Sequence, residues 1–316
     1  MYLALLLALM ATPEKIIIDT DPGDFTDDCV AIVMCLRSAQ HLKVLGITTV
    51  SGNAWAVEGV QYAKETLGLA KASVPVHLGA QRPLRHTAEQ SLKEGPIEFA
   101  GAFARKRPAQ QKETAVDFLI QSLEREPLTI LAIGPLTNIA RLLERRPDLA
   151  AKIQRIVIMG GNVRVGGNAS KAAEFNFWFD PEAAQAVLRS PIREKVLFPL
   201  DICNQAFVTK KHFDELTAVK TPVTEKYAKI AGNGYPGFLK DPKATGFFWD
   251  ELAAAYLIDP GIVQGEESLP LDVETRVGPG YGAVVASKDG QVPTRVMLGL
   301  DYPKAFEHIR RLMTER

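Results

Sequence analysis

The sequence predicts an α/β fold: a mainly parallel open sheet flanked by helices. Short apolar runs bounded by turn residues alternate with amphipathic segments, which is the pattern of βα units. The 316 residues are 47% hydrophobic and 23% charged, a composition that can bury a large core. Because no Ser/Gly-rich or Pro-rich linker divides the chain, we expect one domain over residues 13–316.

The elements of this fold follow from local pattern. Five apolar runs ending in polar or glycine-rich sequence predict the main strands, at residues 15–19, 43–50, 128–133, 155–159 and 195–199. Seven amphipathic segments predict helices, at residues 27–37, 54–67, 114–125, 136–145, 181–188, 249–258 and 303–313. Runs at 271–277, 282–286 and 294–298 predict a small antiparallel addition near the C-terminus. The polar segments 81–111 and 221–245 predict long loops, the first with one or two helical turns.

The first eleven residues, MYLALLLALMA, form an apolar run too short to span a bilayer. The run has the length of a signal-peptide core with a cut after Ala11, although no basic residue precedes it and Leu9 stands where a small residue is expected. We therefore expect a leader over residues 1–12 and a periplasmic or secreted protein. The alternative is an N-terminal helix packed on a cytoplasmic protein. No other segment predicts a membrane span.

Charge and cysteine content exclude several classes of protein. Lys plus Arg equals Asp plus Glu at 37 each, so no broad positive field attracts a nucleic acid. Cys29, Cys35 and Cys203 have no CxxC spacing, which argues against a disulfide framework and a zinc site. Cys29 and Cys35 lie in an apolar helical stretch, so we expect them to be small buried hydrophobes.

The strongest chemical signal is IIIDTDPGDFTDD at residues 16–28, where a buried strand runs into Asp19, Asp21, Asp24, Asp27 and Asp28. So many carboxylates at one strand end repel one another, and a bound divalent cation is the usual compensation. Oxygen ligands without His or Cys favour calcium or magnesium. Helix capping accounts for only one or two of these acids. Since ligands bind at the carboxyl ends of strands in open parallel sheets, we expect the site there.

DTDPG followed by DD resembles the signature of the inosine-uridine type nucleoside hydrolases. Three further segments match that family in the same order: LAIGPLTNIA at 131–140, GGNASKAAEFNFWFDPEAA at 166–184 and WDELAA at 249–254. Four ordered matches over roughly 240 residues are more specific than any one of them. The resemblance implies a calcium-dependent enzyme of nucleoside catabolism or purine salvage that hydrolyses the N-glycosidic bond of ribonucleosides to ribose and free base. It also implies a homodimer or homotetramer.

Carried over to this sequence, the resemblance implies that Asp21, Asp28 and Asp250 bind calcium together with the backbone carbonyl of Ile133. Asp21 would also be the general base that activates the calcium-bound water. Carboxylates beside the sugar ring would stabilise an oxocarbenium-like state, with water attacking from the opposite face. The residues implied to bind ribose are Asp27, Asn53, Asn168, Glu174 and Asn176.

One departure from the family pattern lies in the acidic turn. Asp24, Phe25 and Thr26 stand between DTDPG and DD, where the common form has one residue. We therefore expect a reshaped turn, in which the roles of Asp27 and Asp28 are harder to assign. Asp24 is either a substitute ligand or a solvated loop acid, and we favour the solvated acid.

A second departure concerns the base. Trp249 stands where members that accept purines and pyrimidines carry His, and it resembles the purine-preferring branch, in which an aromatic ring stacks on the base. This predicts a preference for purine nucleosides. Packing of Trp249 in the core with Phe247 and Phe248 is the alternative. Candidates for a second stacking ring are Trp55, Trp178 and Tyr235.

Three other functions compete with nucleoside hydrolysis. A hydrolase of another N-ribosyl compound would use the same ribose and metal site. A nucleoside-binding protein without turnover would not require Asp21. A metal-dependent phosphatase would need basic residues that cradle phosphate, and neither Arg164 nor Lys171 fits such a cradle.

Overall fold

An eight-stranded sheet forms the centre of the computed structural model, which describes residues 12–287 and 292–315. The strand order is β3-β2-β1-β4-β5-β6-β12-β9, and every neighbouring pair is parallel except β12 with β9. The strands are β1 (Glu14–Thr20), β2 (Leu42–Thr49), β3 (Val76–Leu78), β4 (Leu128–Ala132), β5 (Ile153–Met159), β6 (Lys195–Phe198), β9 (Val263–Leu269) and β12 (Thr294–Leu300). The chain order reverses between β1 and β4, so the carboxyl ends of these two strands form the switch point at which such sheets bind ligands.

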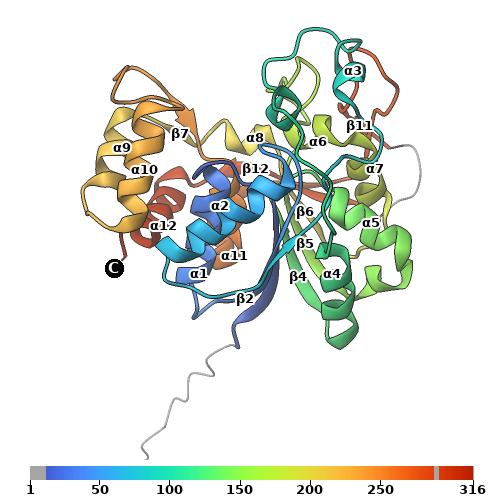
Figure 1. Cartoon of the computed structure of the whole chain (residues 1–316), viewed down its shortest axis with the longest axis horizontal. Helices are drawn as coiled ribbons and strands as arrows, with labels where there is room; N and C mark the ends of the chain where they lie inside the picture. The colour runs from blue at the N-terminus through green and yellow to red at the C-terminus, as the bar shows by residue number, and fades with distance from the viewer. Residues whose placement is uncertain (1–11, 288–291, 316) are drawn as a thin grey trace, which may run out of the picture.

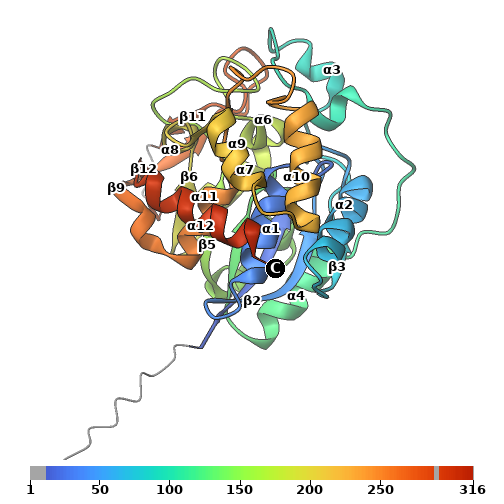
Figure 2. The ribbon, with the colours of Figure 1, turned by 90° about the vertical axis from the view of Figure 1, so that its left-hand side faces the viewer.

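Helices cover both faces of the sheet (Figure 1). On one face lie α1 (Asp27–Arg37), α2 (Ala56–Leu69), α11 (Asp250–Ile258) and α12 (Tyr302–Thr314), with α9 (Lys210–Thr217) and α10 (Pro222–Asn233) outermost, as Figure 2 shows. The other face carries α4 (Ala115–Arg125), α5 (Thr137–Arg145) and α7 (Pro181–Arg189). The fold is therefore a three-layer α/β/α arrangement.

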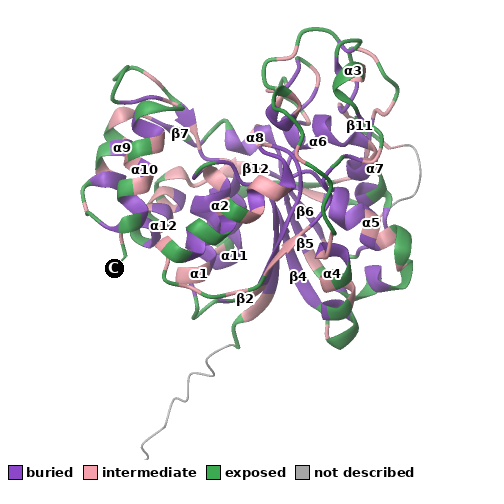
Figure 3. Ribbon diagram, viewed as in Figure 1, coloured by how far each residue is buried: buried purple, intermediate pink, exposed green. Residues whose placement is uncertain are grey.

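Alternation along β1 explains why the sheet has a core on each side. Ile16 and Ile18 pack in one apolar cluster with α1, whereas Ile17 packs in a second cluster with α4 and α5. Successive side chains of a strand point to opposite faces, so an unbroken apolar run buries both. Figure 3 shows the central strands as the most continuously buried part of the molecule.

The five predicted main strands and the seven predicted helices are confirmed, with ends displaced by at most two residues. The predicted antiparallel pair near the C-terminus is confirmed as β10 (Leu271–Val273) with β11 (Val284–Ala286). The 81–111 segment contains α3 (Ala88–Ser91) and a 3-10 turn at Gly101–Ala104, as expected for a long loop with short helical turns.

Two predictions about elements are wrong. Residues 294–298 do not join the antiparallel addition, because β12 pairs in parallel with β6 and extends the main sheet. Residues 221–245 are not a continuous loop, since their first half is α10. The Thr221 hydroxyl accepts a hydrogen bond from Thr224 N (3.2 Å), and Pro222 occupies the first turn, where its missing N–H costs nothing.

The predicted leader falls on residues 1–11, which lie outside the described residues. The leader, the periplasmic or secreted localisation, the single-domain assignment and the homo-oligomeric state all stay predictions. Within residues 12–287 and 292–315, no helix is both long and apolar enough to cross a membrane.

Candidate active site

The turn after β1 and the start of α11 bring three carboxylates together. Asp27 and Asp28 are the first residues of α1, and Asp250 is the first residue of α11. One carboxylate oxygen from each of the three lies within 4.8 Å of the others. Because the backbone N–H groups and the dipole of a helix favour negative charge at its N-terminus, both helices help to hold these acids.

Asp28 is fixed by four hydrogen bonds. Its Oδ1 accepts from the Thr20 hydroxyl and from Asp21 N (3.1 Å). Its Oδ2 accepts from the Thr26 hydroxyl (3.0 Å) and from Asn53 Nδ2 (3.1 Å). Thr26 belongs to the extra residues of the turn, so the departure from the family pattern contributes directly to the position of Asp28.

Asp24, the first residue of the same departure, points away from the cluster. Its carboxylate is about half exposed and forms an ion pair with Lys226 of α10. This placement agrees with the interpretation of Asp24 as a solvated loop acid. Phe25 next to it is buried and adopts a positive φ of 56°, which reverses the chain into α1.

The Asp21 carboxylate lies between two glycines, and one of its oxygens has no hydrogen-bond partner among the described residues. Its Oδ2 accepts a hydrogen bond from Asn53 N (2.6 Å), whereas its buried Oδ1 has no hydrogen-bond partner among the described residues. A Cβ on Gly52 would lie 1.9 Å from Oδ2, and a Cβ on Gly134 would lie 2.8 Å from Oδ1. Sequence reasoning missed both glycines, although each follows soon after a predicted strand, where backbone often approaches a ligand group.

Burial and mutual repulsion act on the whole acidic group. Burial, followed by the charge of Asp28, raises the pKa of Asp21 well above its usual range. The same two causes raise the pKa of Asp27 to about 7. Burial, followed by the charge of Asp27, also raises the pKa of Asp250. An all-oxygen donor set, an unpaired buried carboxylate oxygen and repelling charges together fit a hard divalent cation such as calcium.

Ile133, the residue after β4, lies beside the carboxyl end of β1. Ile133 N donates to the carbonyl of Asp19 (2.8 Å), which continues the pairing of the two strands. The Ile133 carbonyl accepts from Asn176 Nδ2 at 3.4 Å. Asp19 Oδ1 accepts from the Thr48 hydroxyl (2.5 Å) and from Asn138 Nδ2 (2.7 Å), whereas its buried Oδ2 has no hydrogen-bond partner among the described residues.

The predicted ribose-binding segment folds around α6 (Phe175–Phe179). Glu174 caps this helix: its Oε1 accepts from Asn176 N (2.9 Å), and its Oε2 accepts from Phe177 N (3.2 Å) and Gly161 N (2.7 Å). Asn168 Oδ1 accepts from Phe175 N (2.9 Å). Burial raises the pKa of Glu174 to about 7. The cap places Asn176 beside Ile133. Asn168 stabilises the start of α6 through its hydrogen bond from Phe175 N.

Trp249 lies at the entrance to α11 and is paired with Tyr235. The two rings are nearly parallel, with centroids 6.4 Å apart and an interplanar angle of 10°. Trp249 is half-buried, and its buried Nε1 has no hydrogen-bond partner among the described residues. Phe248 points into the core, and Phe247 touches the Trp249 ring with centroids 6.0 Å apart.

The other two candidates for a stacking ring lie elsewhere. Trp55 and Trp178 are buried in a separate aromatic cluster with Phe175 and Phe179. Of the three candidates that the sequence offered, Tyr235 is therefore the one whose ring faces Trp249. It is 62% exposed, which leaves its ring accessible to a ligand.

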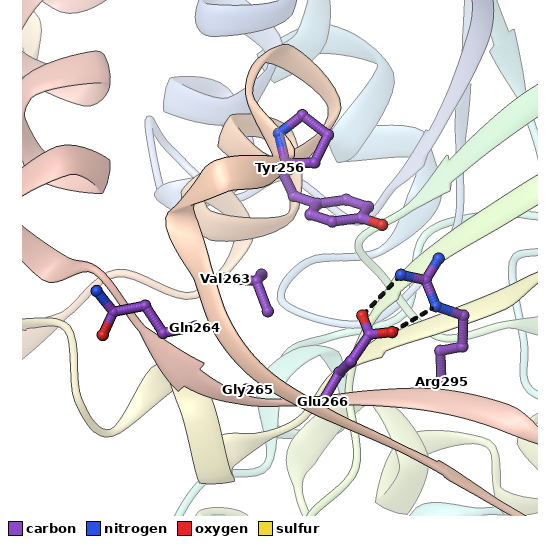
Figure 4. Close-up of a pocket in the computed structure, with 7 residues that line it drawn as sticks. Tyr256, Val263, Gln264, Gly265, Glu266 and Arg295 are labelled. Atoms are coloured by element: carbon purple, nitrogen blue, oxygen red, sulfur yellow. Dashed lines mark hydrogen bonds and ion pairs between the residues drawn. The ribbon is translucent and has the colours of Figure 1, made fainter.

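Two surface hollows lie apart from the acidic group. One, of about 290 Å³, lies between Tyr256, β9 and the start of β12, where Arg295 is paired with Glu266 (Figure 4). The other, of about 640 Å³, lies where β1, β4 and β5 begin. The arginines of both hollows are already paired with glutamates. Open parallel sheets bind ligands at the switch point of their carboxyl ends, so we place the active site at the acidic group.

Comparisons with known proteins identify the family of this chain. The sequence profile described as inosine-uridine preferring nucleoside hydrolase matches residues 16–307. The pyrimidine-specific ribonucleoside hydrolase RihA of Salmonella agona (strain SL483) is 36% identical over 80% of this chain and 81% of its own length. A similar solved structure, an inosine-guanosine nucleoside hydrolase, has a TM-score of 0.79 and 25% sequence identity, and the match covers 96% of this chain and 99% of that chain. The structure of a purine-preferring ribonucleoside hydrolase from Gardnerella vaginalis has a TM-score of 0.78 and 26% sequence identity, and the match covers 95% of this chain and 99% of that chain. The chain therefore belongs to the inosine-uridine preferring nucleoside hydrolase family, a family of ribonucleoside N-glycosidases.

Proposed function

We propose that this enzyme hydrolyses purine ribonucleosides to ribose and free base, with calcium as its cofactor. The observation that carries the proposal is the spare oxygen of Asp21. It is buried and unpaired, and it lies at the switch point of the sheet, in the same acidic group as Asp27, Asp28 and Asp250. A buried carboxylate oxygen without a partner is costly, so its retention indicates a ligand in the working enzyme.

Asp21, Asp28 and Asp250 would hold the cation together with the backbone carbonyl of Ile133. When bound, calcium supplies a Lewis acid that neutralises the carboxylates and makes a nearby water more acidic. Asn53 N occupies Oδ2 of Asp21, so Oδ1 is the atom that accepts the proton of the attacking water. The confinement of Asp21 by Gly52 and Gly134 keeps that atom in place and lowers the entropic part of the barrier.

The sugar would be bound by the amides and acids around this group. Asn53 uses its backbone N–H for Asp21 and its side-chain N–H for Asp28, which leaves its side-chain oxygen to accept from a ribose hydroxyl. Asp27 lies at the open side of the acidic group and is only half-buried. Asn168, Glu174 and Asn176 complete the proposed ribose contacts. Ionised carboxylates near the ring stabilise the positive charge that develops as the glycosidic bond breaks.

Purine preference rests on the pair formed by Trp249 and Tyr235. The two rings are nearly parallel and Tyr235 is exposed, so their aromatic faces are available to stack on a base, and stacking energy increases with the area of the base. Similarity to a pyrimidine-specific enzyme points the other way, whereas similarity to two purine-acting enzymes supports the proposal.

The test is ribose release by the purified protein from inosine, guanosine, adenosine, uridine and cytidine, with and without a calcium chelator. We expect chelator-sensitive release that is faster from the three purine nucleosides. In the Trp249→Ala variant, the ratio of the purine rate to the pyrimidine rate should fall towards one, whereas calcium binding should be retained. Equal rates on all five substrates would contradict the stacking argument, and chelator-resistant release would contradict the metal.

A further inference from the structure

A buried polar triad fastens the 81–111 segment to the helix beside the sugar site. His86 Nε2 lies 2.8 Å from Glu94 Oε1, within ion-pair distance but without the alignment of a hydrogen bond. The other oxygen of Glu94 accepts from Trp178 Nε1 (2.7 Å). His86 Nδ1 lies 3.3 Å from the carbonyl of Phe179. Two contacts of the triad therefore reach α6, whose N-cap is Glu174 and whose second residue is Asn176.

The triad is enclosed by aromatic rings. The His86 ring meets Phe103, Trp178 and Tyr281 edge to face, at centroid distances of 5.1, 5.0 and 4.8 Å. His86 and Glu94 are 3% and 5% exposed. Removing two ionisable groups from water costs free energy that is recovered only in a well-formed arrangement, so such a pair selects one packing of the segment over others.

Hydrogen bonds join the two ends of the 81–111 segment, and its middle part contacts the residue that precedes Asn53. Gln81 and Gln111 exchange two hydrogen bonds, Gln81 Nε2 to the Gln111 carbonyl (2.8 Å) and Gln111 N to Gln81 Oε1 (2.9 Å). Ala102 N donates to the carbonyl of Gly52 (2.7 Å), the residue that confines Asp21. Gly101, with a φ of +52°, allows this approach, because a Cβ there would lie 2.4 Å from the same carbonyl.

We propose that His86, Glu94 and Trp178 are positioning residues that hold the 81–111 segment as a fixed wall of the sugar site. The triad acts on the site through two routes. On one side it orients α6, which carries Glu174 and Asn176. On the other side it holds Gly101 and Ala102 in contact with Gly52, which precedes Asn53. The inference rests on the proposed function only for its effect on catalysis, since the fixed wall itself is measurable without substrate.

The decisive variant is the double substitution His86→Phe with Glu94→Leu. Replacing both members of a buried ionisable pair by apolar residues is often neutral for folding, although Glu94→Leu also leaves Trp178 Nε1 without its acceptor. We expect the amide hydrogens of Ala102 and of Glu98, which donates to the Ala169 carbonyl (2.8 Å), to exchange faster than in the wild type. The KM for inosine should rise about tenfold with a smaller change in kcat, because sugar binding loses its preorganised wall.

Two single variants keep the test sharp if the double variant folds poorly. Glu94→Gln retains an acceptor for Trp178 but removes the carboxylate that faces His86, and Trp178→Phe removes the donor together with part of the buried ring. Each should raise KM by less than the double variant does. Arg105→Ala is the matched control, because Arg105 belongs to the same segment but makes an exposed ion pair with Glu58 (3.6 Å).

Unchanged amide exchange and unchanged KM in the folded double variant would overturn the inference. A wild-type protein that releases no ribose from any nucleoside would instead contradict the proposed function, and the exchange measurement would still decide whether the wall is fixed by the triad.

Discussion

Replacement of Gly52 by Ala adds one methyl group against the proposed catalytic base. A Cβ at this position would lie 1.9 Å from Asp21 Oδ2, 2.7 Å from its Cγ and 2.9 Å from Pro135 Cδ. Ordinary contact begins near 3.4 Å, so the carboxylate or the backbone of residue 52 must move by about 1.5 Å. Pro135 on the other side limits the backbone, which makes Asp21 the group that moves.

The size of the effect follows from that displacement. A misplacement of about 1 Å at a reacting group costs on the order of 100-fold in rate. The displaced carboxylate would also lose its hydrogen bond from Asn53 N, so we expect kcat to fall by about 100-fold or more. The overpacking itself should lower the free energy of unfolding by about 1–3 kcal/mol, which leaves the protein folded at 25 °C.

The assay compares kcat and KM for inosine with the calcium affinity, measured by titration calorimetry, in purified wild type and Gly52→Ala. Gly68→Ala is the matched control. Gly68 lies in α2, and a Cβ there would meet nothing within 4 Å, so this variant should gain about 0.5–1 kcal/mol in stability with unchanged kinetics. A folded Gly52→Ala enzyme with wild-type kcat would refute the assignment of Asp21 as the base.

Three further outcomes are expected. Calcium should raise the thermal midpoint of the wild type but not of Asp28→Asn, as read by scanning calorimetry. Burial raises the pKa of Asp180 from 3.8 to about 6, so its ionisation destabilises the fold as pH rises across that interval. The stability of Asp180→Asn relative to wild type should therefore increase by about 2 kcal/mol between pH 4 and 7 in urea titrations. Lys226→Met breaks the ion pair of an exposed Asp24 and should cost under about 1 kcal/mol, with no loss of calcium binding in the same titrations.

The sequence predicts the main sheet because its strands carry two unambiguous signals. Ile16, Ile17 and Ile18 form an unbroken apolar run that ends in acids, which identifies both a buried strand and the edge where the site lies. β12 was misplaced because partner choice depends on contacts distant in sequence, here with β6. α10 was missed because the Thr221-Pro222 start signal was overlooked within a polar segment.

The site was less predictable than the fold. Acidic residues are visible in the sequence, and the group formed by Asp27, Asp28 and Asp250 contains two of the implied calcium ligands, Asp28 and Asp250. Its third member is Asp27, which the family resemblance implies as a ribose contact, and not Asp21. The hydrogen bond from Thr26 and the confinement by Gly52 were not predictable, since both depend on the shape of the turn. The roles of the site residues in calcium and ribose binding stay predictions.

The residue that caps α6 is tied to both the stability of the fold and the proposed binding of ribose. Glu174 closes the first turn of this helix with both carboxylate oxygens and is also a proposed ribose contact. A screen for cellular abundance and a screen for growth on nucleosides would both score its replacement as harmful. Mutational surveys that subtract one score from the other would therefore classify Glu174 as a purely structural position and overlook its proposed contact with ribose.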